Sequence, residues 1–401
     1  MGIVVQKFGG SSVADIEKLY NICKHIIREY NKGQKVVVVV SAQGKTTDRL
    51  ISEEKDITEN PLPREHDVLV SVGEQITISK LAMCLKEKGY NAISYTGWQL
   101  PIITDSVHGN ARIKYIETEK IKKQLDLGNI VIVAGFQGIN EVGDITTLGR
   151  GGSDTTAVAL AASLNADRCD IYTDVDGVYS SDPKVIENVK KLDEITYDEM
   201  LELASLGAKV LHNRCVEIGK NYDIPINVKS TFENDTIGTR VLENKNLESL
   251  YITGVAKDDN ISRITIVGLE NKIGRFYKVF KLLSENKICV DTIVQSAGEH
   301  AQKDISFTVK NTDAKKTIEL LNKNLIELKA KEIIKCDKLS KISIVGVGIV
   351  NNPGVAAKVF EALYENNINM YMVSTSEIKI SVLVNKKEAN LALKAIHDKF
   401  Y

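Results

Sequence analysis

The chain has 401 residues, of which 43% are apolar and 26% charged, and its formal net charge at pH 7 is -1. This length is too great for one ordinary hydrophobic core and predicts two or three domains of a globular protein. A net charge so close to zero provides no attraction to nucleic acid or to an anionic membrane, so neither is expected as a partner.

Cysteine and histidine usage favours a reduced protein without a metal site of its own. The six cysteines include no C-x-x-C pair, and the six histidines include no H-x-x-x-H pair. We therefore expect structural thiols of a cytoplasmic protein, with no disulfide framework and no transition-metal site. No segment approaches the ~18 apolar residues that span a bilayer. Lys7 and Gly9-Gly10 interrupt the N-terminal apolar run too early for a signal peptide.

Strand-like and helix-like runs alternate through residues 1–245. The Val- and Ile-rich strands are expected in IVVQKF, KVVVVVSA, AISYT, NIVIVAGFQG, CDIYTDV and PINVKST. The amphipathic helices are expected at Asp15–Tyr30, Val72–Lys88, Ser153–Leu164 and Asp198–Asn213. This alternation is typical of an α/β fold with a mostly parallel sheet between helices, in which ligands bind beyond the carboxyl ends of the strands.

The first strand ends in a lysine and a glycine turn, MGIVVQKFGGSSVAD. Lys7 is followed at once by Gly9, Gly10 and two serines. A tight turn after a strand explains the glycines. A phosphate site explains both the glycines and the lysine, and this stretch alone leaves the two interpretations open.

Two familiar nucleotide motifs are excluded. The run ending in Gly44-Lys45-Thr46 resembles a P-loop, but a P-loop requires glycine five positions before Gly44, where the chain has Val39. The segment GRGGSD has Asp154 where the dinucleotide fingerprint G-x-G-x-x-G requires its last glycine, which disfavours a Rossmann dehydrogenase.

A second glycine-rich loop, TTLGRGGSDTTA, leads into an alanine-rich helix. Glycines around Arg150 allow the backbone to approach an anion, and the free N–H groups of a helix N-terminus favour negative charge. Arg150 can bind a carboxylate or phosphate through two hydrogen bonds. The alternative is a capped helix with Asp154 as an N-terminal residue, which does not explain Arg150 between glycines.

Acidic residues accompany two further segments. Glu74 follows Gly73 at the start of a helix, where it is either a partner of the helix dipole or a site for a cationic amine. The loop IYTDVDGVYSSDP lacks the acidic ladder and closing Glu of an EF-hand, so a loop at the edge of a nucleotide is the better interpretation.

The last ~150 residues contain an internal repeat. The segment from Arg263 resembles the segment from Lys341, and each reads strand, Gly- or Pro-containing loop, amphipathic helix, strand. A two-layer βαββαβ module fits each copy. The Lys-rich stretch from Lys310 to Lys341 is predicted as a solvated helix with flanking loops.

Taken together, these segments resemble the aspartate kinases of the amino acid kinase family over essentially the whole chain. The motifs KFGGSSVAD, VVVVVSAQGKTTDRL, SVGE, HGNARI, GFQG, GRGGSDTTA, YTDVDGVYSSDP and GAKVLH follow in the family's order. The resemblance implies an amino acid kinase domain at 1–245 and a regulatory region at 250–401. That region would hold two intertwined ACT domains, at about 262–335 and at about 250–261 plus 336–401.

The resemblance also implies the reaction, in which ATP phosphorylates L-aspartate to 4-phospho-L-aspartate at the start of lysine, threonine and methionine synthesis. Lys7 and Asp154 would be catalytic, with Mg²⁺ carried by the nucleotide. The residues implied for ATP binding are Lys7, Gly9, Gly10, Ser11, Ser41, Gly44, Thr173, Asp174, Tyr179, Lys184 and Lys209. Those implied for aspartate are Thr47, Glu74, Arg150, Gly151, Gly152, Ser153 and Asp154.

An amino-acid effector, lysine and/or threonine, is expected at the ACT domains. The expected effector residues are Asn271, Ile273, Gly274, Asp291, Gln295 and Ser296. Asp291 is alternatively a solvated carboxylate at a strand end. A homodimer or dimer of dimers through the ACT domains is expected, without a fused second enzyme. A catalytically silent sensor and an amino acid kinase of other specificity are the competing hypotheses.

Overall fold

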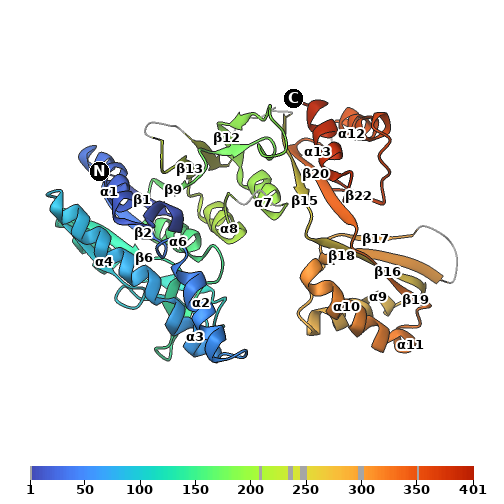
Figure 1. Ribbon diagram of the computed structural model, residues 1–401, viewed down its shortest axis with the longest axis horizontal. Coiled ribbons are helices and arrows are strands. Elements are labelled where there is room, and N and C mark those ends of the chain that lie inside the picture. Colours follow the sequence, from blue (N-terminus) through green and yellow to red (C-terminus); the bar gives the residue numbers. More distant parts are fainter. Residues whose placement is uncertain (1, 207–209, 234–237, 244–250, 297–301, 350–351) are drawn as a thin grey trace. The chain divides into compact units, whose positions relative to one another are not determined.

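The computed structural model of the chain (Figure 1) describes residues 2–206, 210–233, 238–243, 251–296, 302–349 and 352–401. The fold divides into two compact units. Unit 1 comprises residues 1–180 and 190–247, and unit 2 comprises residues 181–189 and 248–401.

An eight-stranded sheet forms the centre of unit 1, with strand order β12-β14-β13-β9-β1-β2-β6-β3. All of its neighbouring pairs are parallel except β13 with β14. The mostly parallel sheet expected from the sequence is confirmed. The bounds of its strands are β1 Ile3–Phe8, β2 Lys35–Val40, β3 Ala92–Tyr95, β6 Ile130–Ala134, β9 Arg168–Thr173, β12 Glu194–Thr196, β13 Ile226–Ser230 and β14 Thr239–Leu242.

Helices cover both faces of this sheet. The helices α1 (Ile16–Asn31) and α4 (Val72–Glu87) pack on one face, against the valines at alternate positions of β2. The helix α6 (Gly152–Leu164) contacts β1, β2 and β9. The helix α8 (Asn213–Tyr222) packs on α6, and α7 (Tyr197–Ser205) packs on α8. Since every residue of β2 from Val36 to Val40 is fully buried, the strand is covered on both faces, as a parallel strand between helices must be.

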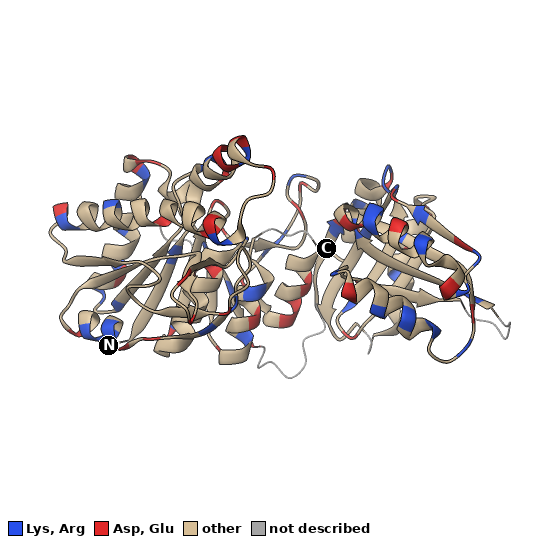
Figure 2. Cartoon of the chain, turned by 90° about the horizontal axis from the view of Figure 1, so that it is seen from below, with Lys and Arg blue, Asp and Glu red and all other residues tan. Residues whose placement is uncertain are grey.

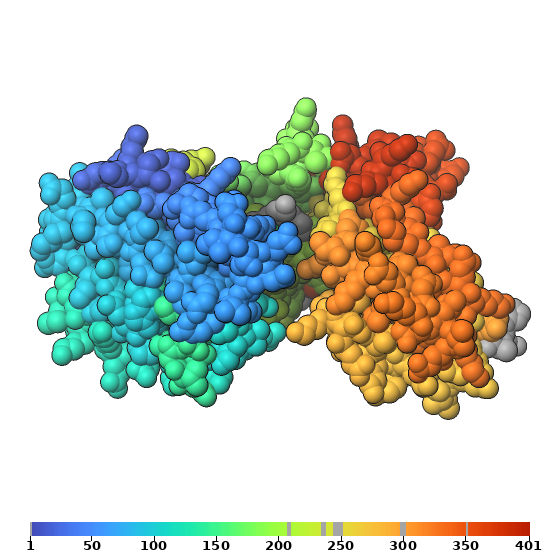
Figure 3. Space-filling view, turned by 60° about the horizontal axis from the view of Figure 1, so that its bottom comes forward, coloured from blue at the N-terminus to red at the C-terminus, as the bar shows by residue number. Residues whose placement is uncertain are grey.

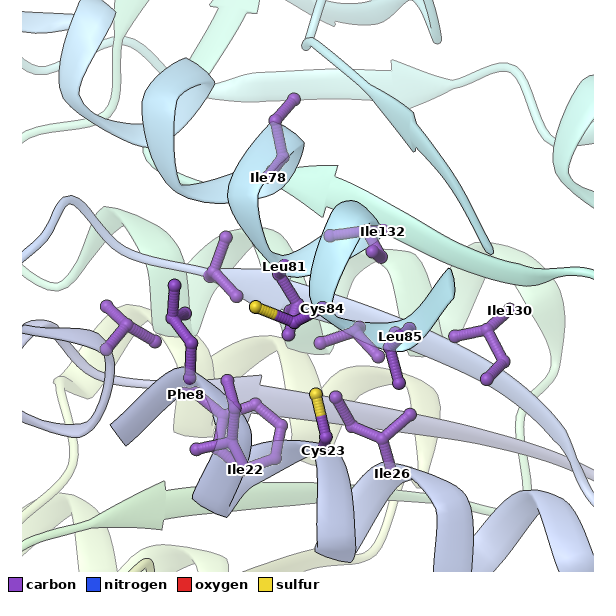
Figure 4. Packing of buried hydrophobic residues seen from close by; sticks show 14 of the residues in the cluster. Phe8, Ile22, Cys23, Ile26, Ile78, Leu81, Cys84, Leu85, Ile130 and Ile132 are labelled. Carbon is purple, nitrogen blue, oxygen red and sulfur yellow. The ribbon is translucent and has the colours of Figure 1, made fainter. Parts of the chain in front are cut away.

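The core between α1, α4 and the sheet is shown in Figure 4. Phe8 and Ile132 from the sheet meet Ile22 and Ile26 from α1 and Leu81 from α4. The expectation that no segment approaches the length of a membrane span is wrong for one helical stretch. The stretch Pro63–Glu87, which includes α4, is long and apolar enough, by length and composition alone, to cross a membrane. Half of its apolar window is buried inside the protein, which is the behaviour of a core helix.

One predicted helix of unit 1 is wrong in its second half. The sequence predicts a single helix over Asp198–Asn213, but α7 ends at Ser205 and a separate helix, α8, begins at Asn213. Gly207 lies two positions after Ser205 in the sequence, and a glycine disfavours continuation of a helix. The start of α7 is fixed by Thr196, whose side chain and that of Glu199 form reciprocal capping bonds.

A small second sheet and short elements complete unit 1. Its strand order is β5-β4-β7-β8, and β8 leads directly into the GRGG loop. The remaining bounds are η1 Gly10–Val13, α2 Thr46–Ile57, α3 Pro63–Val70, β4 Ile102–Thr104, β5 Ile113–Ile116, α5 Glu119–Asp126, β7 Gln137–Ile139, β8 Ile145–Thr147, β10 Val178–Tyr179 and β11 Lys191–Leu192.

Unit 2 consists of two antiparallel four-stranded sheets with helices, as the internal repeat predicts. The first sheet has the order β17-β18-β16-β19, and the second has the order β15-β20-β22-β21. The first sheet is built from β16 Ile261–Glu270, α9 Arg275–Glu285, β17 Ile293–Gln295, β18 Gln302–Lys310, α10 Asn311–Lys323, α11 Leu325–Leu328 and β19 Glu332–Cys336. The second is built from β15 Tyr251–Asp258, β20 Leu339–Val347, α12 Pro353–Glu365, β21 Met372–Thr375, β22 Lys379–Asn385 and α13 Ala389–Asp398.

The Lys-rich stretch between the repeats holds more than a helix with loops. It contains α10, but also β19, which pairs with β16 and closes the edge of the first sheet. Lysines at 331, 335 and 338 hide the strand pattern around Ile333 and Ile334. The orange atoms of this region lie at the surface in Figure 3. Figure 2 shows the charged residues of the chain on its helices and loops.

A nine-residue segment of the N-terminal half packs into the second core of unit 2. Residues 181–189 leave unit 1 after Ser180 and return to it at Lys190. Ile186 is 3% exposed and belongs to the cluster formed by Val255, Ile344 and Val359, with Val185 and Val189 packed beside it. The sequence placed this segment in the kinase region, whereas its apolar side chains complete a core in the C-terminal half.

Candidate active site

The loops with candidate residues meet at the carboxyl edge of the central sheet. Phe8 lies beside Val40 and Tyr172 in the register of the sheet, and Val40 lies beside Ala134. The turns that follow β1, β2, β6 and β9 therefore emerge side by side, as expected for parallel strands.

Lys7 and Asp154 form the central contact of this edge. The Lys7 ammonium lies 2.6 Å from a carboxylate oxygen of Asp154, and the two side chains are only 10% and 15% exposed. Lys7 is the next-to-last residue of β1, while Asp154 lies in the first turn of α6. The sheet thus brings together two motifs that are 147 positions apart in the sequence. It places the positively charged Lys7 side chain at the ends of both glycine loops.

The glycine turn after β1 packs directly on the loop after β2. The Gly44 N–H donates to the Gly10 carbonyl at 2.9 Å, and the Ser41 N–H donates to the Phe8 carbonyl at 3.1 Å. A Cβ on Gly10 would lie 3.0 Å from the carbonyl oxygen of Ala42, so the close approach of these two loops favours glycine there. The turn after β1 therefore contacts Ser41 and Gly44 after β2, and a Cβ on Gly9 would lie 3.5 Å from the Lys7 ammonium.

Glu74 is a buried carboxylate next to this region. One of its oxygens accepts the Ala42 N–H at 3.0 Å, and the other has no hydrogen-bond partner among the described residues. Burial raises the pKa of Glu74 to about 8, although the Ala42 hydrogen bond opposes the change. Gly73 allows this arrangement, because a Cβ there would lie 2.6 Å from that of Ala42. Thr47 lies in the first turn of α2, which follows the same loop.

The GRGG loop wraps the N-terminus of α6 and leaves Arg150 exposed. Gly151 has a φ of +70°, and a Cβ on it would lie 2.4 Å from the side chain of His212. Gly152 and Ser153 pack against the turn after β6, where Phe136 has a φ of 69° and Gly135 faces Ser153. Within the described ranges, the Arg150 guanidinium has no ion-pair partner, so it is available to an anionic ligand.

The remaining residues predicted to bind the nucleotide lie in different parts of the chain. Thr173 and Asp174 lie at the end of β9, where the Thr173 hydroxyl donates to Asp174 at 3.0 Å. The Tyr179 hydroxyl donates to Asp176 at 2.8 Å, a bond that together with burial raises the pKa of Tyr179 to about 12. Lys184 is exposed in the segment 181–189 of unit 2, and Lys209 lies outside the described residues.

The predicted effector residues lie in the first sheet of unit 2 and the loops around it. Asn271, Ile273 and Gly274 form the turn before α9, with Ile273 fully exposed and Gly274 at a φ of +86°. Gln295 ends β17, and the Ser296 hydroxyl accepts the Asp304 N–H at 3.0 Å.

Asp291 is ion-paired rather than freely solvated. A carboxylate oxygen lies 2.6 Å from the ammonium of Lys341, which is 6% exposed on β20. Burial tends to raise the pKa of Asp291, but the Lys341 ammonium outweighs it and holds that pKa below its usual value. An ammonium group of the chain itself thus occupies the carboxylate that the sequence assigns to an effector.

Sequence reasoning did not single out three residues that contact these loops: Asp67, Arg214 and His212. Asp67 and Arg214 bind the backbone next to the GRGG loop, and His212 packs on Gly151. No local pattern marks the first two. His212 belongs to the GAKVLH motif, which was the available signal.

Comparison with protein families gives two matches. A model described as "Amino acid kinase family" matches residues 2–230, and one described as "ACT domain" matches 264–325 and 342–400. The aspartokinase of Bacillus sp. (strain MGA3) is 53% identical over 100% of this chain and 97% of its own length. Aspartokinase 2 of Bacillus subtilis (strain 168) is 51% identical over 100% of this chain and 98% of its own length.

The chain belongs to the aspartokinase family. It is therefore a kinase, a phosphotransferase of the amino acid kinase fold followed by ACT domains. Among solved aspartokinases, Escherichia coli aspartokinase III in complex with aspartate and ADP is 27% identical, with a TM-score of 0.83 over 99% of both chains. The same aspartokinase in complex with lysine and aspartate has a TM-score of 0.76 over 100% of this chain and 99% of that one, at 28% identity.

Proposed function

We propose that this protein transfers the γ-phosphoryl group of ATP to the side-chain carboxylate of L-aspartate, giving 4-phospho-L-aspartate and ADP. The observation that carries the proposal is the Lys7–Asp154 ion pair between two glycine loops. The buried Glu74 contacts the loop after β2, and the exposed Arg150 belongs to the GRGG loop. The names of the relatives supply the substrate, since they are aspartokinases over the full chain.

The chemical problem is the meeting of two anions. A carboxylate oxygen of aspartate bonds to the γ-phosphorus, and the bond from that phosphorus to the β,γ-bridging oxygen breaks, with its electron pair leaving on ADP. No base has to remove a proton, because a carboxyl group with a pKa of about 3.9 is already ionised at neutral pH. Catalysis then consists of positioning and charge neutralisation.

On the phosphate side, Lys7 neutralises the transferring group, and Asp154 orients the Lys7 ammonium. The backbone N–H groups of the glycine turn bind phosphate oxygens, and Ser41 and Gly44 form the opposite wall. Thr173, Asp174, Tyr179, Lys184 and Lys209 surround the nucleotide. ATP enters with Mg²⁺, held by phosphate oxygens and water. In the described ranges, no group of three His, Cys, Asp or Glu side chains is arranged to hold a metal.

On the aspartate side, the unpartnered oxygen of Glu74 accepts the α-ammonium group. Thr47 and Arg150 bind substrate carboxylate oxygens, with the backbone of Gly151, Gly152 and Ser153 behind Arg150. A buried carboxylate without a cation favours a ligand that brings one, because the ligand repays the desolvation of Glu74.

We also propose regulation by lysine and/or threonine at the turn Asn271–Gly274 together with Asp291, Gln295 and Ser296. The boundaries proposed for the ACT domains are about 262–335 and about 250–261 plus 336–401. A homodimer or dimer of dimers through the ACT domains, in the cytoplasm, completes the proposal. An effector acts here by binding one kinase conformation better than another.

The deciding experiment measures ADP release with aspartate, glutamate and N-acetylglutamate as acceptors. We expect ADP release with aspartate and none with glutamate or N-acetylglutamate. Release with another acceptor would reassign the specificity, and release with none would make the protein a silent sensor. The same assay with lysine and threonine, singly and together, identifies the effector.

A further inference from the structure

We propose that Asp67 is a positioning residue for the aspartate site, acting through the backbone that carries Arg150. The proposal rests on the proposed function. Asp67 lies on α3 and does not belong to any of the glycine loops. Its side chain is fully buried, yet none of the roles above uses it.

Asp67 accepts hydrogen bonds from two separate backbone segments. Its carboxylate oxygens accept the Gly109 N–H at 3.0 and 3.1 Å and the Thr147 N–H at 3.1 Å. The Thr147 hydroxyl and the His108 Nδ1 also donate to it, the latter at 2.8 Å. Because a carboxylate can only accept, the proton of the His108 ring is on Nδ1.

These contacts connect three parts of the site that are distant in sequence. Helix α3 continues through Ser71 into α4, which carries Glu74. Thr147 ends β8, three residues before Arg150. Gly109 lies against the same loop, since its carbonyl oxygen is 3.0 Å from where a Cβ of Gly149 would be. One buried carboxylate therefore sets the position of the Arg150 loop relative to the helix of Glu74.

A second anchor holds the same two segments to α8. Arg214 donates to the Leu148 carbonyl at 2.6 Å and to the Ala111 carbonyl at 2.7 Å. Asp67 thus binds N–H groups and Arg214 binds carbonyl groups of neighbouring residues in the two segments. Asp67 and Arg214 therefore hold the backbone around Arg150 in place. The Arg150 side chain itself remains free to bind a ligand.

The site requires a carboxylate and not merely a polar side chain. Both oxygens of Asp67 face N–H donors, so either orientation of an asparagine would direct its NH₂ group at a backbone N–H. Asp67→Asn removes the charge and replaces one hydrogen bond with a contact between two donors, without changing the volume of the side chain. The backbone at Gly109 or Thr147 must then move, and the Arg150 loop moves with it.

The experiment compares Asp67→Asn and Thr147→Val with Thr146→Val as matched control. Thr146 precedes Thr147 on β8, is also fully buried, and shares a hydroxyl bond with Thr104 at 2.6 Å. Steady-state kinetics with the full-length protein should show KM for aspartate raised about tenfold or more in Asp67→Asn and severalfold in Thr147→Val, a loss of ~1–2 kcal/mol by the relation of tenfold to 1.4 kcal/mol. KM for ATP should stay within about twofold, and Thr146→Val should resemble the wild type in both constants.

Amide hydrogen exchange without substrate provides a second measurement that does not depend on the proposed reaction. Faster exchange is expected in Asp67→Asn at Gly109 and Thr147 and through Gly149–Gly151, with β1 and β2 unchanged. Equal changes in both KM values, or faster exchange throughout unit 1, would assign Asp67 a general structural role and overturn the proposal. Unchanged KM for aspartate with unchanged exchange would also overturn it. If the wild-type protein is inactive with aspartate but Asp67→Asn still shows the local increase in exchange, the proposed function is rejected and the positioning role of Asp67 is retained.

Discussion

The ammonium of Lys7 lies 2.6 Å from a carboxylate oxygen of Asp154. The pair is mostly buried, so its attraction is weakly screened by solvent, and each group holds the other in one place. A phosphoryl group entering between the glycine loops would meet a cation that is already oriented, which is the form of electrostatic stabilisation that costs no reorganisation during reaction.

Lys7→Ala should lower kcat by about 10²–10³-fold, since the cation at the transferring phosphoryl group is removed. The control is Lys7→Ala combined with Asp154→Asn, because the single variant leaves a buried carboxylate unpaired and also loses stability. Circular dichroism and thermal unfolding check the fold of both. Turnover near the wild-type level in a folded Lys7→Ala protein would refute the role of Lys7.

The pH dependence of kcat/KM for aspartate should report Glu74. Only the ionised carboxylate attracts an ammonium group, and burial raises the pKa of Glu74 to about 8. We therefore expect kcat/KM to rise with pH through neutrality and level off above pH ~8, since this constant reports groups of the free enzyme. Glu74→Gln should raise KM for aspartate and abolish that rise. The same slope in both proteins would assign the titration to another group.

Stability should show the opposite trend with pH. The pKa of Glu74 is raised from 4.5 in the unfolded chain to about 8 in the folded protein, so the folded state binds more protons between these values. The free energy of unfolding contributed by Glu74 is present below pH ~4.5 and is lost as the pH rises toward 8. Glu74→Gln does not titrate, and its Tm relative to the wild type should increase between pH ~5 and ~9. A constant difference in Tm would contradict the raised pKa.

Gly151→Ala should cost both stability and activity. The φ of +70° disfavours alanine by about 1–2 kcal/mol, and the new Cβ would collide with the His212 ring. Gly33→Ala is the control, since Gly33 has a φ of +82° with open space around it. The control should lose stability to a similar backbone strain but retain KM for aspartate. Equal effects on KM in the two variants would exclude a role for the Gly151–His212 contact.

Asp291→Asn should weaken inhibition by the effector amino acid about tenfold or more and leave kcat without effector unchanged. An ammonium group binds Asp291 more strongly when the carboxylate is charged and unoccupied, so Lys341→Met should instead lower the inhibitory concentration. Inhibition curves for lysine and threonine test both variants. Identical curves for Asp291→Asn and the wild type would place the effector elsewhere.

Local patterns predicted the elements of the fold well where sequence and environment agree. The valines of β2 and the glycine turn after β1 show their positions without any tertiary information. The break between α7 and α8 was missed, because the period of apolar residues continues past Ser205. Strand β19 was missed because Lys331 and Lys335 flank its two adjacent isoleucines, which lie in an edge strand of the sheet.

The site divides in the same way. Lys7, Glu74 and Arg150 stand in short motifs that carry their own chemical logic. Asp67 is one aspartate in an ordinary helix, and its importance comes from backbone N–H groups 42 and 80 positions away. The Lys341–Asp291 pair joins residues 50 positions apart, from two different repeats. Contacts of this kind depend on how the segments pack, which no local pattern contains.

The course of the chain through residues 181–189 bears on protein engineering. Because Ile186 completes a core of unit 2 while its neighbours Ser180 and Lys190 belong to unit 1, the backbone crosses between the units three times. A single cut near residue 247 would leave the apolar segment 181–189 on the kinase fragment without its packing partners. The regulatory fragment would lack the side chains of that segment in its core. Exchange of regulatory halves between related enzymes therefore calls for two grafts, one of them only nine residues long.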